Sequence, residues 1–228
     1  VIAIYLEGMK EGRRFLETAQ RVSKKKPIII LKGGCSEQGA RATLSHTASI
    51  AGTDIVFDAM IRQAGIIRVF QLEHLFIMAE ALLKQPLPGG KRVAVVGNGG
   101  QSVTTIDNLI SLGLEVPEFR PEDKADLKAI LPPHAPIPSN PVDFAAGAME
   151  TMDEIKVIEK LISMDYIDGV ITNVPMNRTY MKTNKDAREK AIVAAVEKFC
   201  ELPKKYNKPI ITQVLMPSEL VENILRRA

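Results

Sequence analysis

A histidine among small and hydroxyl-bearing residues is the first group in the sequence that could do chemistry. His46 stands in the segment SHTASIAGTD, residues 45–54, just before an expected helix. The segment from Lys32 to Ser49 is predicted to be a long loop, and His46 is its only nitrogen nucleophile that is neutral at pH 7. Loops of this length in compact domains are usually functional or disordered. The pattern is compatible with a nucleophilic histidine or with an ordinary surface histidine.

Three further candidates follow expected strands, where the ligands of parallel sheets bind. Glu7 ends the first apolar run and either faces a ligand or is a solvated turn residue. The segment GNGGQSV, residues 97–103, joins a strand to a helix, and its small residues would let backbone N–H groups approach an anion. It matches neither the dinucleotide-binding motif nor the P-loop, so a tight turn is the alternative. Asp143 in NPVDFAAGA, residues 140–148, could orient a loop or cap a helix.

Continuous apolar runs alternate along the chain with segments of helical periodicity. Runs without polar alternation indicate strands that are buried on both faces, as in a parallel α/β sheet. A helix is expected from residue 54, with Ile55 and Val56 on its apolar face and Gly65 at its end. The expected strands are VIAIYLEG, KPIIILKGG, IIRVF, RVAVVGNGG, LEVPEF, DGVITNVP and KPIITQVL.

A break in this alternation divides the chain in two. The segment PLPGGK, residues 86–91, is predicted to be a linker. The predicted fold class is therefore α/β, with two doubly wound parallel-sheet units at residues 1–85 and 92–228. Because the chain begins inside an apolar run, we expect it to be a piece of a longer protein.

Composition and charge exclude several classes of protein. The chain has 30 basic and 27 acidic residues, seven Phe, four Tyr and no Trp, which argues against a nucleic-acid surface. No apolar run is long enough to cross a membrane. Cys35 and Cys200 lack CxxC spacing, so neither a disulfide scaffold nor a metal site is predicted, and reduced cysteines favour the cytoplasm. His74, in an apolar helix, is expected to pack, and His134, in a proline-rich loop, is expected to be exposed.

Several segments carry a resemblance to a known family. YLEG, KPIIILKGG and GARATLSHTASIAGTDIVFDAMIRQAGIIRV resemble the NDP-forming (ADP-forming) acyl-CoA synthetases, which are related to succinyl-CoA synthetase. VAVVGNGGQSVTTIDNL, NPVDFAAGA and DGVITNVP resemble the further flavodoxin-like ligase domain of that family. The resemblance covers nearly all of the chain and implies that both units are flavodoxin-like. The sequence departs from the family at Gln101, where another glycine is more common, and it contains neither the CoA-binding Rossmann domain nor the ATP-grasp domain.

The resemblance implies a chemical role for the segment around His46. The family makes an acyl phosphate from acyl-CoA and phosphate, and passes the phosphoryl group to a histidine and then to ADP. By motif match that histidine is His46, and the carboxylate that holds its other ring nitrogen is Glu7. Helix starts would bind the phosphoryl group. The implied phosphate-binding residues are Ser45, Ser49, Gly99, Gly100, Gln101 and Ser102.

The resemblance also implies substrates and partners. CoA and ATP or ADP with Mg²⁺ would be bound mainly by the domains that this sequence lacks, and phosphate, a small carboxylic acid and acyl-CoA would take part in the reaction. The CoA-binding and ATP-grasp domains or subunits would be partners, in an oligomer. One alternative is the non-catalytic, ligase-like regulatory region of a protein acetyltransferase, but such regions tend to lose the histidine. Another is a flavodoxin-like binding domain without chemistry, which the pairing of Glu7 with His46 disfavours.

Overall fold

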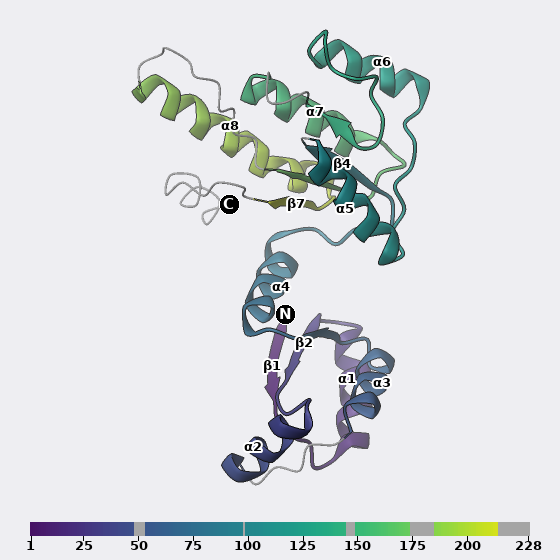
Figure 1. Cartoon of the computed structure of the whole chain (residues 1–228), viewed down its shortest axis with the longest axis vertical. Helices are drawn as coiled ribbons and strands as arrows, with labels where there is room; N and C mark the ends of the chain where they lie inside the picture. The colour runs from purple at the N-terminus through teal and green to yellow at the C-terminus, as the bar shows by residue number, and fades with distance from the viewer. Residues whose placement is uncertain (48–52, 98, 145–148, 174–184, 214–228) are drawn as a thin grey trace. The chain divides into compact units, whose positions relative to one another are not determined.

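The chain folds as two compact units, Val1–Lys84 and Gln85–Ala228. The computed structural model describes residues 1–47, 53–97, 99–144, 149–173 and 185–213. Each unit is built on one parallel sheet with helices on its faces (Figure 1). The predicted α/β fold class is confirmed. The division between the units falls beside the segment predicted to be a linker, residues 86–91.

The sheet of the first unit has the strand order β1-β2-β3, and its central strand is completely buried. Ile28 and Ile30 of β2 pack with α1 and α3, whereas Ile29 and Leu31 pack with α4. Successive side chains of a strand point to opposite faces, so helices cover both sides of this sheet. The elements are β1 (Ile2–Leu6), α1 (Gly12–Ser23), β2 (Ile28–Lys32), α2 (Glu37–Thr47), α3 (Asp54–Gln63), β3 (Ile67–Val69) and α4 (Leu72–Lys84).

The segment predicted to be a long loop contains a helix, α2, so this prediction was wrong. The Ser36 hydroxyl oxygen accepts a hydrogen bond from the Gly39 N–H at 3.0 Å, and Glu37 lies in the first turn of the helix. A hydroxyl cap and an acidic first turn both stabilise a helix start. The sequence of this helix has little apolar periodicity, and its one large apolar side chain, Leu44, is exposed. The hydrophobic pattern therefore did not predict the helix.

Helix α3 buries a different face from the one predicted. Ile55 and Val56 are exposed, whereas Phe57 and Ile61 pack against β2. The helix is apolar on two sides, so periodicity alone could not choose between them. Its end is as predicted, because Gly65 follows it with φ at +66°, a conformation that glycine adopts without strain.

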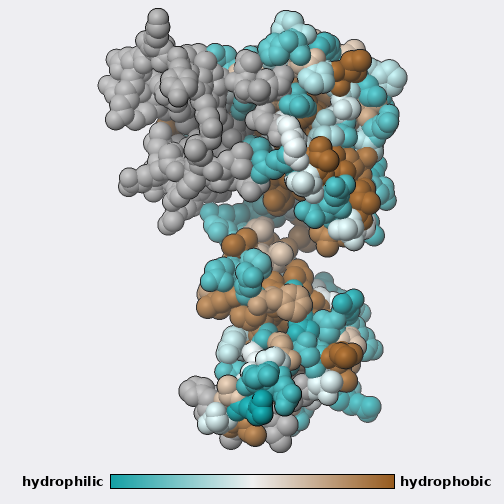
Figure 2. All heavy atoms as spheres, in the orientation of Figure 1, coloured by the Kyte–Doolittle hydropathy of each residue, from teal (hydrophilic) through white to brown (hydrophobic). Residues whose placement is uncertain are grey.

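Helix α4 covers the other face of the first sheet and also presents apolar side chains to solvent. Leu75 is buried against β2, whereas Phe76 and Leu83 are exposed, and Figure 2 shows hydrophobic side chains on the surface over this helix.

His74 is exposed rather than packed, which corrects the expectation for it, and His134 in the second unit is exposed as expected. No described helix is long and apolar enough to cross a membrane.

The sheet of the second unit has the strand order β5-β4-β6-β7, and all of its strand pairs are parallel. Its core lies between the sheet and α6, α7 and α8, where side chains such as Val96, Leu127, Ile158 and Phe199 are buried. The elements are β4 (Val93–Gly97), α5 (Gly100–Ser111), α6 (Pro121–Ile130), β5 (Val142–Asp143), α7 (Thr151–Ser163), β6 (Gly169–Asn173), α8 (Lys185–Tyr206) and β7 (Ile210–Gln213).

The strand expected at LEVPEF does not form; only an isolated bridge joins Glu115 to Arg92. The Asn140 side chain takes the hydrogen-bonding positions along this side of β4: its Oδ1 accepts from the Val95 N–H at 2.9 Å, and its Nδ2 donates to the Val93 carbonyl at 3.0 Å. Pro117 also has no N–H for a ladder, and its carbonyl accepts from the same Nδ2. The amide of one side chain therefore replaces part of a strand.

An ion pair fixes the starts of β4 and β6. Arg92 Nε and Nη2 donate to the two carboxylate oxygens of Asp168 at 2.9 and 2.8 Å, and the Arg92 backbone N–H donates to the same carboxylate. These hydrogen bonds lower the pKa of Asp168 to about 2. A Cβ on Gly90 would collide with the Asp168 carboxylate, so the close approach of the two segments requires glycine.

Candidate functional site

The carboxyl edge of the first sheet positions Glu7. This residue follows β1 directly, is partly buried, and accepts a hydrogen bond from the Tyr5 hydroxyl at 3.0 Å. The hydrogen bond raises the pKa of Tyr5, because ionising the phenol beside a carboxylate would lose the bond and bring like charges together. A Cβ on Gly33 would lie 2.8 Å from the Tyr5 hydroxyl oxygen and 3.4 Å from Glu7 Cγ. Glycine at position 33 therefore lets the chain after β2 pass close to this pair.

His46 lies in the last turn of α2, within the connection between β2 and α3. Its side chain lies outside the described part of the chain, as does Ser49, so the predicted pairing of His46 with Glu7 stays a prediction. Ser45 is exposed, and its hydroxyl donates to the Ala42 carbonyl at 2.8 Å, within its own helix. Its hydroxyl hydrogen is thus already engaged, although its oxygen can still accept a bond.

A charged cluster that the sequence analysis did not predict is built on the last residue of β2, on β3 and on the first residues of α3. Arg68 Nη2 is 2.7 and 2.9 Å from the two carboxylate oxygens of Asp54, and Arg68 Nη1 is 3.1 Å from Oδ1 of Asp58. Lys32 Nζ is 3.4 Å from Asp54 Oδ1. The Lys32 and Arg68 side chains are only 3% and 8% exposed. Hydrogen bonds from Arg68 lower the pKa of Asp54 and of Asp58.

The sequence showed the two cations of this cluster, but not their partners. Lys32 ends the apolar run IIILK, and Arg68 interrupts the short apolar run IIRVF. A charged residue inside a buried strand needs a partner of opposite charge, because desolvation of a lone charge is costly. The partners, Asp54 and Asp58, are one helical turn apart on α3, a spacing that places both carboxylates on one face.

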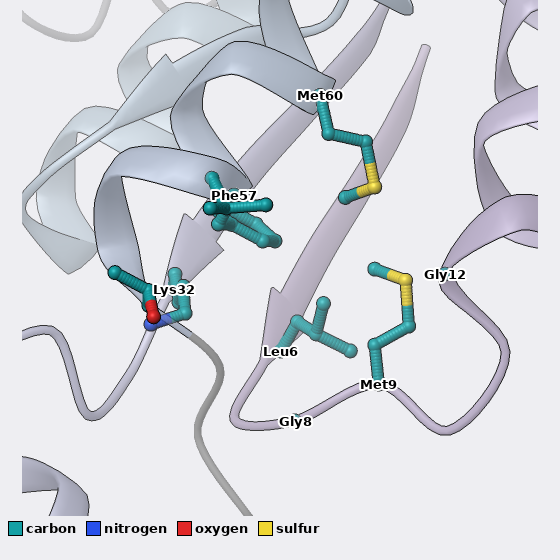
Figure 3. A pocket seen from close by; sticks show the side chains of 9 residues that line it. Leu6, Gly8, Met9, Gly12, Lys32, Phe57 and Met60 are labelled. Carbon is teal, nitrogen blue, oxygen red and sulfur yellow. The ribbon is translucent and has the colours of Figure 1, made fainter.

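A cavity of about 160 Å³ opens between the end of β1 and α3 (Figure 3). A cavity of similar volume in another protein holds benzene. Figure 3 shows the side chains of Met9 and Met60 pointing toward one another across it. Lys32 contributes the only charge among the described lining residues, and that charge is paired with Asp54, so the cavity fits a small apolar group. The lining residues are Leu6, Gly8, Met9, Gly12, Lys32, Thr53, Val56, Phe57 and Met60.

The carboxyl edge of the second sheet brings together small residues, neutral polar groups and one carboxylate. Gly97 ends β4, Asp143 pairs with it in register at the end of β5, and Asn173 ends β6. A Cβ on Gly97 would lie 3.2 Å from both Ser102 Oγ and Asn173 Nδ2. The strand end, the start of α5 and β6 therefore meet closely here, and Asn173 is a residue of this edge that the sequence did not single out.

Helix α5 starts with groups that suit an anion. Gly99 is its N-cap, with φ +54° and ψ −139°, and has no side chain to cap the first N–H groups. Uncapped N–H groups and the helix dipole favour a negative charge at this point. The predicted phosphate ligands Gly99, Gly100, Gln101 and Ser102 are consecutive here, although Ser102 is buried and only 7% exposed.

Comparison with known proteins identifies the family. Residues 1–82 match the succinyl-CoA ligase like flavodoxin domain. The chain is 44% identical over 148 residues, 64% of its length and 32% of the relative, to the alpha subunit of the ADP-forming acetate–CoA ligase II of Pyrococcus furiosus. It is 37% identical over 216 residues, 92% of its length and 30% of the relative, to the ADP-forming acetate–CoA ligase II of Archaeoglobus fulgidus.

Solved structures agree with these sequence matches. The dinucleotide forming acetyl-coenzyme A synthetase 1 of Ca. Korarchaeum cryptofilum, in complex with phosphate and ADP, matches 98% of the chain with a TM-score of 0.76 and 29% identity. The chain covers 47% of that structure and about a third of the length of the two curated relatives. The predicted resemblance is confirmed: the chain belongs to the family of ADP-forming acyl-CoA ligases, of which it spans one region.

Proposed function

We propose that this chain forms the phosphoryl-carrier unit and the following ligase unit of an acid–CoA ligase. The enzyme interconverts a small carboxylic acid, CoA and ATP with acyl-CoA, ADP and phosphate. The observation that carries the proposal is the position of His46: it lies in α2, which follows the carboxyl end of β2, in the unit where Glu7 closes the neighbouring strand. This unit is also the one that matches the succinyl-CoA ligase like domain.

His46 would carry the phosphoryl group between two partners. A neutral ring nitrogen attacks the phosphorus of an acyl phosphate, the N–P bond forms as the P–O bond to the acyl group breaks, and the carboxylate leaves as the free acid. An oxygen of ADP then attacks the phosphorus, and the N–P bond breaks to regenerate imidazole. Glu7 accepts a hydrogen bond from the other ring nitrogen, which fixes the tautomer and stabilises the cationic, phosphorylated ring.

The second unit would bind the phosphoryl group during this transfer. The N-cap of α5 is Gly99, which has no side chain to cap the helix start, and this supports a role of the helix start in anion binding. Ser45, Ser49 and Ser102 are the further proposed ligands. Mg²⁺ would enter with the nucleotide and neutralise part of its charge.

Substrates and partners follow from the same proposal. CoA and ATP would be held by CoA-binding and ATP-grasp domains or subunits outside this chain, and the relative from P. furiosus is itself named as an alpha subunit. An assembly of several subunits is therefore proposed. Neither Cys35, which is exposed, nor Cys200, which is partly buried, forms a disulfide, which supports a reducing, cytoplasmic setting.

The test is a coupled assay of the complete enzyme with CoA, ATP and a panel of small carboxylic acids. The unchanged enzyme should form acyl-CoA with at least one acid, His46→Ala should form none, and the exposed His74→Ala should keep full activity. Far-UV circular dichroism checks that each variant is folded. Net synthesis by the His46→Ala enzyme would refute the carrier role, and the absence of synthesis by the unchanged enzyme with every acid would refute the ligase activity.

A further inference from the structure

Both ends of the connection that carries His46, residues 33–53, lie close to one buried guanidinium, that of Arg68. The connection leaves at Lys32, the last residue of β2, and returns at Asp54, the first residue of α3. Arg68 of β3 binds Asp54 directly, and Lys32 Nζ lies 3.4 Å from the same carboxylate. Cys35, at the start of the connection, places its sulfur 3.5 Å from Arg68 Nη2 and donates to the Lys32 carbonyl at 3.1 Å. Both ends of the connection are thus tied to Arg68.

The orientation of this guanidinium is fixed from several sides. Nη2 is shared between the two oxygens of Asp54, whereas Nη1 reaches Asp58 one helical turn further along α3. The ring centroids of Phe57 and Phe70 lie 5.4 and 4.9 Å from the guanidinium carbon. Sliding or rotating α3 against β3 would break at least one of these contacts. A lysine has a single nitrogen, so it could not reproduce this fork, in which one guanidinium nitrogen binds Asp54 and the other binds Asp58.

Stability alone is a weak reason for such a cluster. Removing charges from water is costly, and buried ion pairs can often be replaced by apolar side chains of similar size without loss of stability. What a buried, forked ion pair adds is one defined geometry. Here the geometry that it defines is the distance and orientation between the end of β2 and the start of α3, which are the two anchor points of the segment that bears His46.

We propose that Arg68 is a positioning residue for phosphoryl transfer: through Asp54, Asp58 and Cys35 it holds both ends of the 33–53 connection, and so sets where His46 can reach. The inference rests on the proposed function. Attack on phosphorus requires an aligned nucleophile, and a misplacement of about 1 Å can slow such a reaction about a hundredfold. Loss of the fork should therefore slow transfer to His46 without weakening nucleotide binding, which is assigned to another domain.

The test measures phosphorylation of the complete enzyme by γ-labelled ATP in a rapid-quench experiment. Arg68→Met should lower the maximal rate of phosphohistidine formation by about tenfold to a hundredfold and leave the KM for ATP unchanged. Arg68→Lys, which keeps the charge, should fall between Arg68→Met and the unchanged enzyme. The matched control is Arg62→Met: Arg62 pairs with the same Asp58 at 2.8 Å, but is 81% exposed and touches neither end of the connection.

Asp54→Asn supplies a second variant that tests the same coupling. If Arg68 acts through Asp54, the double variant Arg68→Met/Asp54→Asn should be little slower than the worse single variant. Rates are compared well below the melting temperature of each variant, so a purely structural defect would disappear on cooling.

Three results would overturn the inference. These are an unchanged rate for Arg68→Met, fully additive effects of the two substitutions, and a slowing that vanishes wherever the variant is folded. In each of these cases labelling of His46 in the unchanged enzyme would leave the carrier role intact. An unchanged enzyme that is not labelled at His46 would instead refute the proposed function, and the inference with it.

Discussion

The carboxyl edges of the two sheets share an architecture but present different chemical groups. At the edge of the first sheet, Glu7, Lys32 and Arg68 bring full charges together, and two of these three side chains are almost completely buried. At the edge of the second sheet, a glycine turn, a buried serine hydroxyl and the Asn173 amide lie close together, with Asp143 at the neighbouring strand end. The first edge is dominated by ion pairs, whereas the second combines neutral donors with the single carboxylate of Asp143.

This difference fits two complementary tasks. A residue that carries a phosphoryl group must be oriented, and its cationic form must be stabilised, for which fixed carboxylates and ion pairs are suited. A site that receives and releases the same group can use N–H donors and a helix dipole, which bind an anion without a full opposite charge. Under the proposed function, two similar sheets would carry different chemistry because their loops and strand ends differ.

The largest effect on phosphoryl transfer should come from removing the negative charge of Glu7, at the edge of the first sheet. Glu7→Gln should lower the level of phosphohistidine about tenfold to a hundredfold, because a hydrogen bond to a charged group contributes about 1.5–3 kcal/mol. Labelling of the complete enzyme with γ-labelled ATP measures this level. The control is Glu11→Gln, since Glu11 is exposed and pairs only with the exposed Arg14 among the described residues. Equal labelling of both variants would contradict the role of Glu7.

One carboxylate in each unit should respond to pH in the opposite direction from the other. Burial raises the pKa of Glu154 in α7 to about 7. Its contribution to stability is present below its ordinary pKa and is lost as the pH rises through about 7. Arg68 lowers the pKa of Asp54, so the contribution of Asp54 is present at neutral pH and is lost as the pH falls below the ordinary range of aspartate.

Glu154→Gln should therefore stabilise the chain only where the carboxyl group would be ionised. We expect the free energy of unfolding to rise by about 2 kcal/mol at pH 8 and to change little at pH 4, since a shift of this size corresponds to no more than about 3 kcal/mol. Urea unfolding at the two pH values measures the difference, and Glu150→Gln, at an exposed position, is the control. A gain of equal size at both pH values would show that burial does not control the ionisation of Glu154.

A smaller effect should follow from strain in the glycine turn of the second edge. Gly99 has φ +54° and ψ −139°, which an alanine adopts only at a cost of about 1–3 kcal/mol. A Cβ at Gly100 meets no atom within 4 Å, and Gly100 already lies in the helix. Gly99→Ala should lower the melting temperature and slow turnover several-fold, whereas Gly100→Ala should leave the melting temperature unchanged. Identical behaviour of the two variants in melting and activity assays would argue against a built anion site.

The smallest effect should come from Tyr5. Its hydroxyl donates a hydrogen bond to Glu7, and Tyr5→Phe removes that donor while keeping the ring. Tyr5 is 58% exposed, so solvent weakens this hydrogen bond, and the phosphohistidine level should change only a few-fold. A change as large as that of Glu7→Gln would mean that Tyr5 itself takes part in the transfer.

Features that depend on one segment of the chain could be predicted from the sequence. The run IIIL predicts a strand buried on both faces, and Ile28 to Leu31 are buried against helices on both sides of the first sheet. Gly65 predicts the end of α3 because the left-handed turn after a helix favours glycine. Both features follow from local composition, which a single sequence displays.

Features that depend on a distant partner were not readable. The sequence shows Arg68 inside an apolar run, but its partner Asp54 is supplied by another element 14 residues away. The missing strand at LEVPEF has a similar cause, because the side chain that replaces it is Asn140, on a different segment. Helix α2 was not predicted because it is stabilised by a cap and by helix-forming residues rather than by a buried face.

The most direct test of the carrier role is to locate the phosphoryl group on the chain. After a brief reaction of the complete enzyme with γ-labelled ATP, digestion with trypsin releases the peptide of residues 42–62, in which His46 is the only histidine. We predict an acid-labile, base-stable label in this peptide, as a phosphoramidate requires, and its loss in His46→Ala. A label in another peptide, or an acid-stable label on a hydroxyl group, would contradict the account.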